Sequence, residues 1–100
     1  MAQVVYSFRA LKDFERLVSF LTEREPELAE LAVARISEAV SALERHPLIG
    51  RPVERGLREL VISRGRTGFI ALYRFLNAED AVLILALRHQ REAGYTDADD

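Results

Sequence analysis

The side chains best suited to chemistry in this chain lie close together near its C-terminal end, within Leu85–Tyr95. Arg88, His89, Arg91 and Tyr95 follow a run of apolar residues that is typical of a buried strand. Guanidinium groups bind phosphate or carboxylate, and an imidazole can move a proton. The stretch therefore has three interpretations: a site that acts on a phosphate, a surface that holds an acidic segment of a protein partner, or the solvated end of a strand.

Three further arginines, Arg64, Arg66 and Arg74, are expected on or beside the same sheet. Arg74 lies in an apolar stretch that alternates as a strand does, which directs its side chain to one face of a sheet. Arg64 and Arg66 surround the glycine turn that precedes that stretch. Arg88 and His89 are adjacent in a strand, so they point to opposite faces. The candidates for binding a target are Arg64, Arg66, Arg74, Arg88, His89 and Arg91.

Other kinds of functional site find little support. The chain has no Cys, and its two His have neither HxxxH nor HExxH spacing, so we expect no metal site. It has no nucleophile elbow, and the glycine turn links two strands without opening a helix, as a phosphate loop would. We therefore expect no cofactor and no nucleophilic catalysis.

Charge is distributed unevenly along the chain. The net charge is −3 over residues 1–44, +5 over 45–91 and −4 over 92–100. Every cation except Lys12 is Arg, which suits recognition of an anionic surface. A sequence pI near 5.7 is nevertheless low for a dedicated nucleic-acid binder.

The hydrophobic pattern predicts the elements that position these side chains. Residues 3–8 are rich in β-formers, and Ser7 can cap a following helix. Apolar residues at helical spacing then predict two helices in an antiparallel hairpin, the second starting at Pro26 and ending at His46-Pro47. Further strands are expected over 57–63, 69–76 and 81–89.

The expected fold is an α+β domain of order β-α-α-β-β-β, with a helical hairpin packed on a mostly antiparallel four-stranded sheet. The last strand is apolar on both faces, which predicts a central position. We expect residues 1–95 to form a single domain and residues 96–100 a disordered acidic tail. The N-terminus lacks a leader pattern and no apolar run is long enough to span a membrane, so we expect a cytoplasmic protein with no membrane partner.

Three stretches of the sequence resemble the toxin subunits of the RelE/ParE superfamily of bacterial type II toxin–antitoxin systems. They read "HPLIGRPV", "RELVISRGRTGFIALYRF" and "VLILALRHQREAGY". The resemblance covers the chain from about Val4 to Tyr95, and "LRHQRE" is its most specific part. This part is more similar to the ParE branch than to the RelE branch. The fold expected from the hydrophobic pattern is also the fold of that superfamily.

The resemblance to the ParE branch implies a toxin of the plasmid-stabilisation type that inhibits DNA gyrase and catalyses no reaction. It also implies a cognate antitoxin, of ribbon-helix-helix type, whose C-terminal segment wraps the toxin. An antitoxin helix needs an apolar groove. The candidates for this groove are Leu17, Leu21, Ile36 and Val40.

The RelE branch implies a different activity, ribosome-dependent cleavage of messenger RNA. Under that alternative, Arg74 and Arg88 fill two basic positions, and His89 or Tyr95 acts as acid or base. The many Lys of that branch are absent here, because the only Lys is Lys12. A third alternative is a domain that binds a protein partner without toxicity.

Overall fold

The computed structural model describes residues 1–62 and 68–89. The expectations for Arg64, Arg66, Arg91 and Tyr95, and for the tail at 96–100, lie outside the described residues. The elements with their bounds are β1 Gln3–Tyr6, α1 Phe8–Arg24, α2 Pro26–Arg45, β2 Arg51–Pro52, the short 3₁₀ turn η1 Glu54–Gly56, β3 Arg58–Val61, β4 Phe69–Leu76 and β5 Ala81–His89.

The strands form one sheet in the order β1-β5-β4-β3-β2. β1 runs parallel to β5, and every other neighbouring pair is antiparallel. The predicted central position of the last strand is confirmed, since β5 lies between β1 and β4. The sheet has one strand more than predicted. The additional strand is Arg51–Pro52, which pairs with β3 at the sheet edge, where the missing N–H of Pro52 costs nothing.

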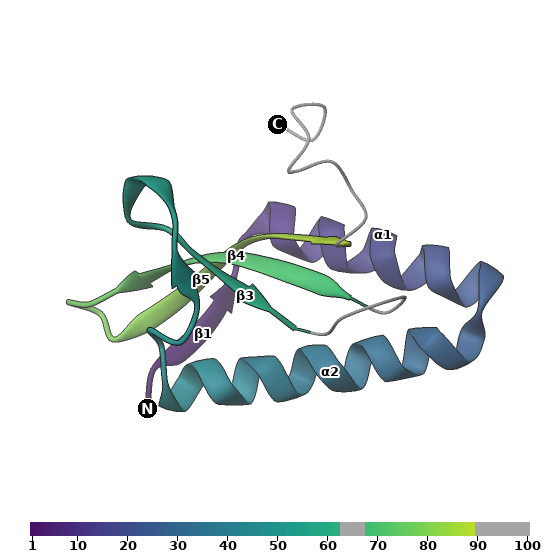
Figure 1. The fold of residues 1–100 in the computed structure, drawn as a ribbon, viewed down its shortest axis with the longest axis horizontal. Coiled ribbons are helices and arrows are strands. Elements are labelled where there is room, and N and C mark those ends of the chain that lie inside the picture. Colours follow the sequence, from purple (N-terminus) through teal and green to yellow (C-terminus); the bar gives the residue numbers. More distant parts are fainter. Residues whose placement is uncertain (63–67, 90–100) are drawn as a thin grey trace.

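Both predicted helices form, and together they make a hairpin whose arms join at Glu25 (Figure 1). Ser7 is the N-cap of α1, and its Oγ accepts a hydrogen bond from the Ala10 N–H at 3.0 Å. Pro26 opens α2 in the first turn, where its missing N–H needs no partner. His46 ends α2 directly before Pro47.

The helical hairpin covers one face of the sheet (Figure 1). On β4 the alternate residues Phe69, Ala71 and Tyr73 are buried, while the residues between them are half-buried. The register pairs Ala71 with Leu87 and Tyr73 with Ile84, and both partners are buried too. Buried residues of both helices, such as Leu17 and Leu43, form one cluster with these strand residues, and the core therefore lies between helices and sheet.

The connector between α2 and β2 is fixed by the hydroxyl of the buried Tyr73. This hydroxyl donates to the Pro47 carbonyl at 2.8 Å and accepts from the Gly50 N–H at 2.9 Å. Arg58 donates to two further carbonyls of residues 46–50, at 3.1 and 2.8 Å. A Cβ on Gly50 would lie 2.7 Å from the Tyr73 ring, so this close approach requires glycine.

Candidate functional site

The face of the sheet away from the helices carries two of the predicted arginines. We define the open face as Ile70, Leu72, Arg74 and Leu76 of β4 with Leu83, Ala86 and Arg88 of β5. Cross-strand pairs share a face, so the pairs Ile70–Arg88 and Arg74–Leu83 place both arginines on it. Arg74 is four residues beyond Ile70, which separates the two arginines by about 13 Å along the strands.

The surroundings of Arg74 are set by the turn η1. Arg74 approaches this turn at Gly56, where an added Cβ atom would lie 3.5 Å from the Arg74 Nη1 atom. Gly56 has φ +75° and Arg55 has φ +62°, so the turn depends on left-handed backbone at two successive residues. On the neighbouring edge, Arg51 donates to Glu59 at 2.7 Å. Arg74 therefore lies near a left-handed turn, and the Arg51–Glu59 pair on the neighbouring edge adds no net charge.

Arg88 and His89 lie on opposite faces of β5, as the alternation predicted. Arg88 directs its guanidinium Nη1 toward the carbonyl of His89 at 3.4 Å. His89 pairs with Phe69 and therefore faces the helix side, where its ring meets the Phe69 ring edge-on at 5.7 Å between centroids. The imidazole and the two guanidinium groups are thus not directed at a common point.

This arrangement determines what the described residues can do chemically. Acid–base catalysis needs a proton-transferring group within hydrogen-bond reach of the same substrate that the cations bind. Arg74 and Arg88 are far apart on one face, and His89 is on the other. Between the two arginines lie the half-buried or buried side chains of Leu72, Leu83 and Ala86. An extended surface with charge near both ends and apolar area between them suits a macromolecular partner.

Three of the four residues predicted to line the antitoxin groove are buried in this structure. Leu17, Leu21 and Ile36 are 4 to 5% exposed, because the apolar stripes of both helices pack into the core. Val40 is half-buried and lines a small cavity between α2 and the sheet. Large apolar side chains are exposed elsewhere, at Phe8, Leu11, Phe20, Leu48 and Ile49.

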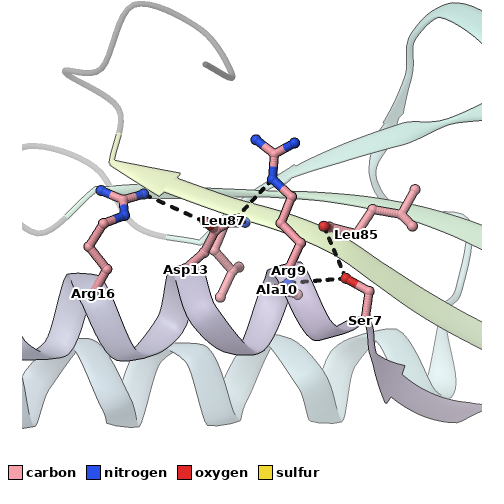
Figure 2. A network of polar contacts seen from close by, with 7 residues as sticks. All are labelled: Ser7, Arg9, Ala10, Asp13, Arg16, Leu85 and Leu87. Atoms are coloured by element: carbon pink, nitrogen blue, oxygen red, sulfur yellow. Dashed lines mark hydrogen bonds and ion pairs between the residues drawn. The ribbon is translucent and has the colours of Figure 1, made fainter. Parts of the chain in front are cut away.

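A network of polar contacts that was not predicted from the sequence fixes the end of β5 (Figure 2). β1 ends at Tyr6 opposite Ile84, so β5 continues past its neighbour on that side. The Ser7 N–H donates to the Ile84 carbonyl at 2.9 Å, and the Ser7 hydroxyl to the Leu85 carbonyl at 3.1 Å. The start of α1 thereby takes the place of the missing strand.

Asp13 completes this network from the next turn of α1. Its Oδ2 accepts a hydrogen bond from the Leu87 N–H at 2.9 Å, and the residue is only 4% exposed. Arg9 and Arg16 flank the carboxylate at 3.8 and 3.7 Å (Figure 2). One signal existed in the sequence: Asp13 falls on the same helical stripe as Ala10 and Leu17, where an acid must find partners.

Two tyrosines have perturbed acidity. Burial raises the pKa of Tyr6 and of Tyr73 above the ordinary tyrosine value of 10.0. For Tyr73 the Gly50 hydrogen bond and the positive charge of Arg58 oppose this effect of burial on the pKa.

Among the residues that the structure describes, no group of three or more His, Cys, Asp or Glu could hold a metal ion. Over the same residues, no helix is long and apolar enough to cross a membrane.

Comparison with known proteins identifies the family. The family model described as the ParE toxin of type II toxin-antitoxin system, parDE, matches residues 4–94. Toxin RelE3 of Caulobacter vibrioides is 34% identical over 92 residues, which are 92% of this chain and 98% of that protein. Toxin RelE1 of the same organism is 35% identical over 75 residues, covering 75% of this chain and 81% of that protein.

Solved structures share the fold. The chromosomal ParDE toxin–antitoxin system from P. aeruginosa is similar with a TM-score of 0.73 and 27% identity, covering 89% of this chain and 96% of that chain. The intact E. coli RelBE toxin–antitoxin complex has a TM-score of 0.65 over 92% of this chain and 100% of that chain. At 13% identity, the second likeness concerns the fold alone.

Proposed function

We propose that this chain, which belongs to the ParE toxin family of type II toxin–antitoxin systems, arrests growth by inhibiting DNA gyrase. The observation that carries the proposal is the placement of Arg74 and Arg88 on the open face, apart from each other and from His89. This placement favours a surface that binds a protein target over a cluster that cleaves RNA.

The chemistry of the open face supports binding to a protein. Leu72, Leu76 and Leu83 provide apolar area that a protein partner can bury, and the arginines can pair with its carboxylates. A protein that binds ribosomal RNA gains affinity from strong positive charge, because RNA is a polyanion. The sequence pI of this chain is near 5.7, which does not suit such a target. The inhibition we propose needs no reaction at the toxin itself.

A cognate antitoxin is the second partner. Two of the similar solved structures are toxin–antitoxin assemblies, the P. aeruginosa ParDE system and the RelBE2 complex from Mycobacterium tuberculosis. We propose an antitoxin of ribbon-helix-helix type. Because Leu17, Leu21 and Ile36 are buried, its contacts must involve other side chains.

The alternative is a ribosome-dependent endoribonuclease. The observation in its favour is that three curated relatives from Caulobacter vibrioides, 32 to 35% identical, bear the name RelE. Under this alternative, Arg74 and Arg88 bind RNA and His89 or Tyr95 transfers the proton. A non-toxic binding domain would show neither activity.

The test is DNA supercoiling by purified gyrase, without ribosomes, in the presence of the purified protein. We expect the wild type to inhibit, and Arg74→Glu and Arg88→Glu to raise the concentration needed for half-inhibition about tenfold or more. Arg35→Glu is the matched control, since Arg35 is an exposed arginine on α2 that pairs with Glu38 at 2.8 Å.

A second assay separates the alternatives. Messenger RNA is incubated with translating ribosomes and the same variants, and its cleavage is mapped. Supercoiling that continues at full rate beside ribosome-dependent cleavage would overturn the gyrase proposal. Loss of that cleavage in His89→Ala or Tyr95→Ala, by about 10²–10⁴-fold, would then establish the nuclease.

A further inference from the structure

Phe8 is an exposed aromatic residue at the very start of α1. It is 75% exposed, more than any other large apolar side chain described except Met1. Large aromatic side chains at protein surfaces are frequently anchors for a partner.

Phe8 borders a shallow, open depression of about 440 Å³. The other described residues that line it are Arg9, Lys12, Asp13 and Arg16, and we call these four residues together with Phe8 the α1 basic patch. Positions 9, 12, 13 and 16 have the i, i+3, i+4, i+7 spacing of one helix face, which extends for about 10 Å. Lys12 and Arg16 are exposed and Arg9 is half-buried.

The described residues of the α1 basic patch carry a formal charge of +2, in a chain whose net charge is −2. Among the described residues that line the depression, three are cations and one, Asp13, is an acid whose Oδ2 accepts a hydrogen bond from the Leu87 N–H. The Lys12 ammonium lies 5.2 Å from the centroid of the Phe8 ring, so cation and aromatic surface are presented side by side. Leu11, 48% exposed, adds aliphatic area one turn from Phe8.

We infer that the α1 basic patch binds an acidic segment of a partner protein that carries an apolar side chain. The carboxylates would meet the three cations, and the apolar side chain would cover Phe8 and Leu11. A nucleic-acid strand fits less well, because the cations extend for only about 10 Å of helix and Leu11 offers no contact to a phosphate. The inference does not depend on gyrase or on toxicity, since the patch is on α1 and not on the open face.

The helix α1 also contains a matched control. Phe20 is 53% exposed, and the guanidinium of Arg24 lies 3.9 Å from its ring centroid. This second aromatic–cation pair is outside the depression. Substitutions at Phe8 and Lys12 are preferable to those at Arg9 and Arg16, because the two arginines also flank the buried Asp13.

The experiment measures fluorescence anisotropy of a labelled peptide of about fifteen residues, with Glu and Leu along one helical face. The full chain should bind it, with affinity that falls as salt is raised. Phe8→Ala and Lys12→Glu should each weaken binding about tenfold or more, while Phe20→Ala and Arg24→Glu change it less than about twofold. Circular dichroism and thermal unfolding establish that every variant is folded.

Four results would overturn the inference. The first is a peptide titration that does not distinguish the two aromatic–cation pairs, because binding is absent or because both pairs affect it equally. The second is binding of labelled single-stranded oligo(dT) that Lys12→Glu abolishes, while the peptide does not bind. The third is peptide binding only after removal of residues 92–100, which would assign the patch to the chain's own acidic end. The fourth is self-association lost in Phe8→Ala, which would assign it to a second copy.

Discussion

Replacing Asp13 should weaken the attachment of α1 to β5 and destabilise the whole domain. The carboxylate accepts from the Leu87 N–H at 2.9 Å, and losing this charge-assisted bond leaves a buried donor without an acceptor, which costs about 1.5–3 kcal/mol. Arg9 and Arg16 contribute little more, because their side chains are 29% and 47% exposed and water screens each pair to about 0.5 kcal/mol.

These terms predict that Asp13→Ala lowers the free energy of unfolding by about 2.5–4 kcal/mol. Asp13→Asn should cost less, about 1–2 kcal/mol, because its amide oxygen can still accept from Leu87. Glu38→Ala is the control: it removes an exposed acid paired with Arg35 at the same i,i+3 spacing, and should cost less than about 0.5 kcal/mol.

The assay is urea unfolding of the variants, combined with hydrogen exchange of the Leu87 amide by NMR. The amide should exchange faster in Asp13→Ala, beyond what the lower global stability explains, and keep part of its protection in Asp13→Asn. Equal destabilisation by Asp13→Ala and Glu38→Ala, or unchanged protection at Leu87, would refute this reasoning.

Further predictions concern the connector that Tyr73 holds. Tyr73→Phe should lower the free energy of unfolding in urea by about 1–3 kcal/mol, because the Gly50 N–H loses its buried acceptor. Tyr6→Phe should lower it less, because the Tyr6 hydroxyl has no hydrogen bond to a described residue. The raised pKa of Tyr73 makes a contribution to stability that is complete below pH 10.0 and is lost as the pH rises through the folded-state pKa. Stability of the wild type above pH 10.0 should therefore fall more steeply than that of Tyr73→Phe, and equal slopes would contradict this. Gly50→Ala should lower the free energy of unfolding by about 1–3 kcal/mol, because its Cβ would lie 2.7 Å from the Tyr73 ring. A crystal structure of Gly50→Ala in which Tyr73 has not moved would contradict this prediction.

Local pattern was sufficient to predict most of the architecture. The alternation of β4 and β5 placed Arg74 on one face and separated Arg88 from His89, and the pairing register agrees. Ser7, Pro26 and His46-Pro47 marked the helix ends because caps and proline act within a few residues. The strand Arg51–Pro52 was missed because two residues carry no periodicity.

Features that depend on distant contacts were not predicted. Asp13 and Leu87 are separated by 74 residues, so nothing local in the sequence identifies their hydrogen bond. Leu17, Leu21 and Ile36 were expected to serve a partner because amphipathic spacing does not tell which surface an apolar stripe covers. In the structure all three side chains are buried in the core of the domain.

Pulse labelling of DNA and protein synthesis after induced expression tests whether the toxin acts on gyrase through the open face, as we propose. We predict that DNA synthesis falls first, and that Arg74→Glu with Arg88→Glu delays the fall while Arg35→Glu does not. An earlier fall in protein synthesis would contradict the claim and favour the nuclease, and continued growth with neither falling would contradict toxicity itself.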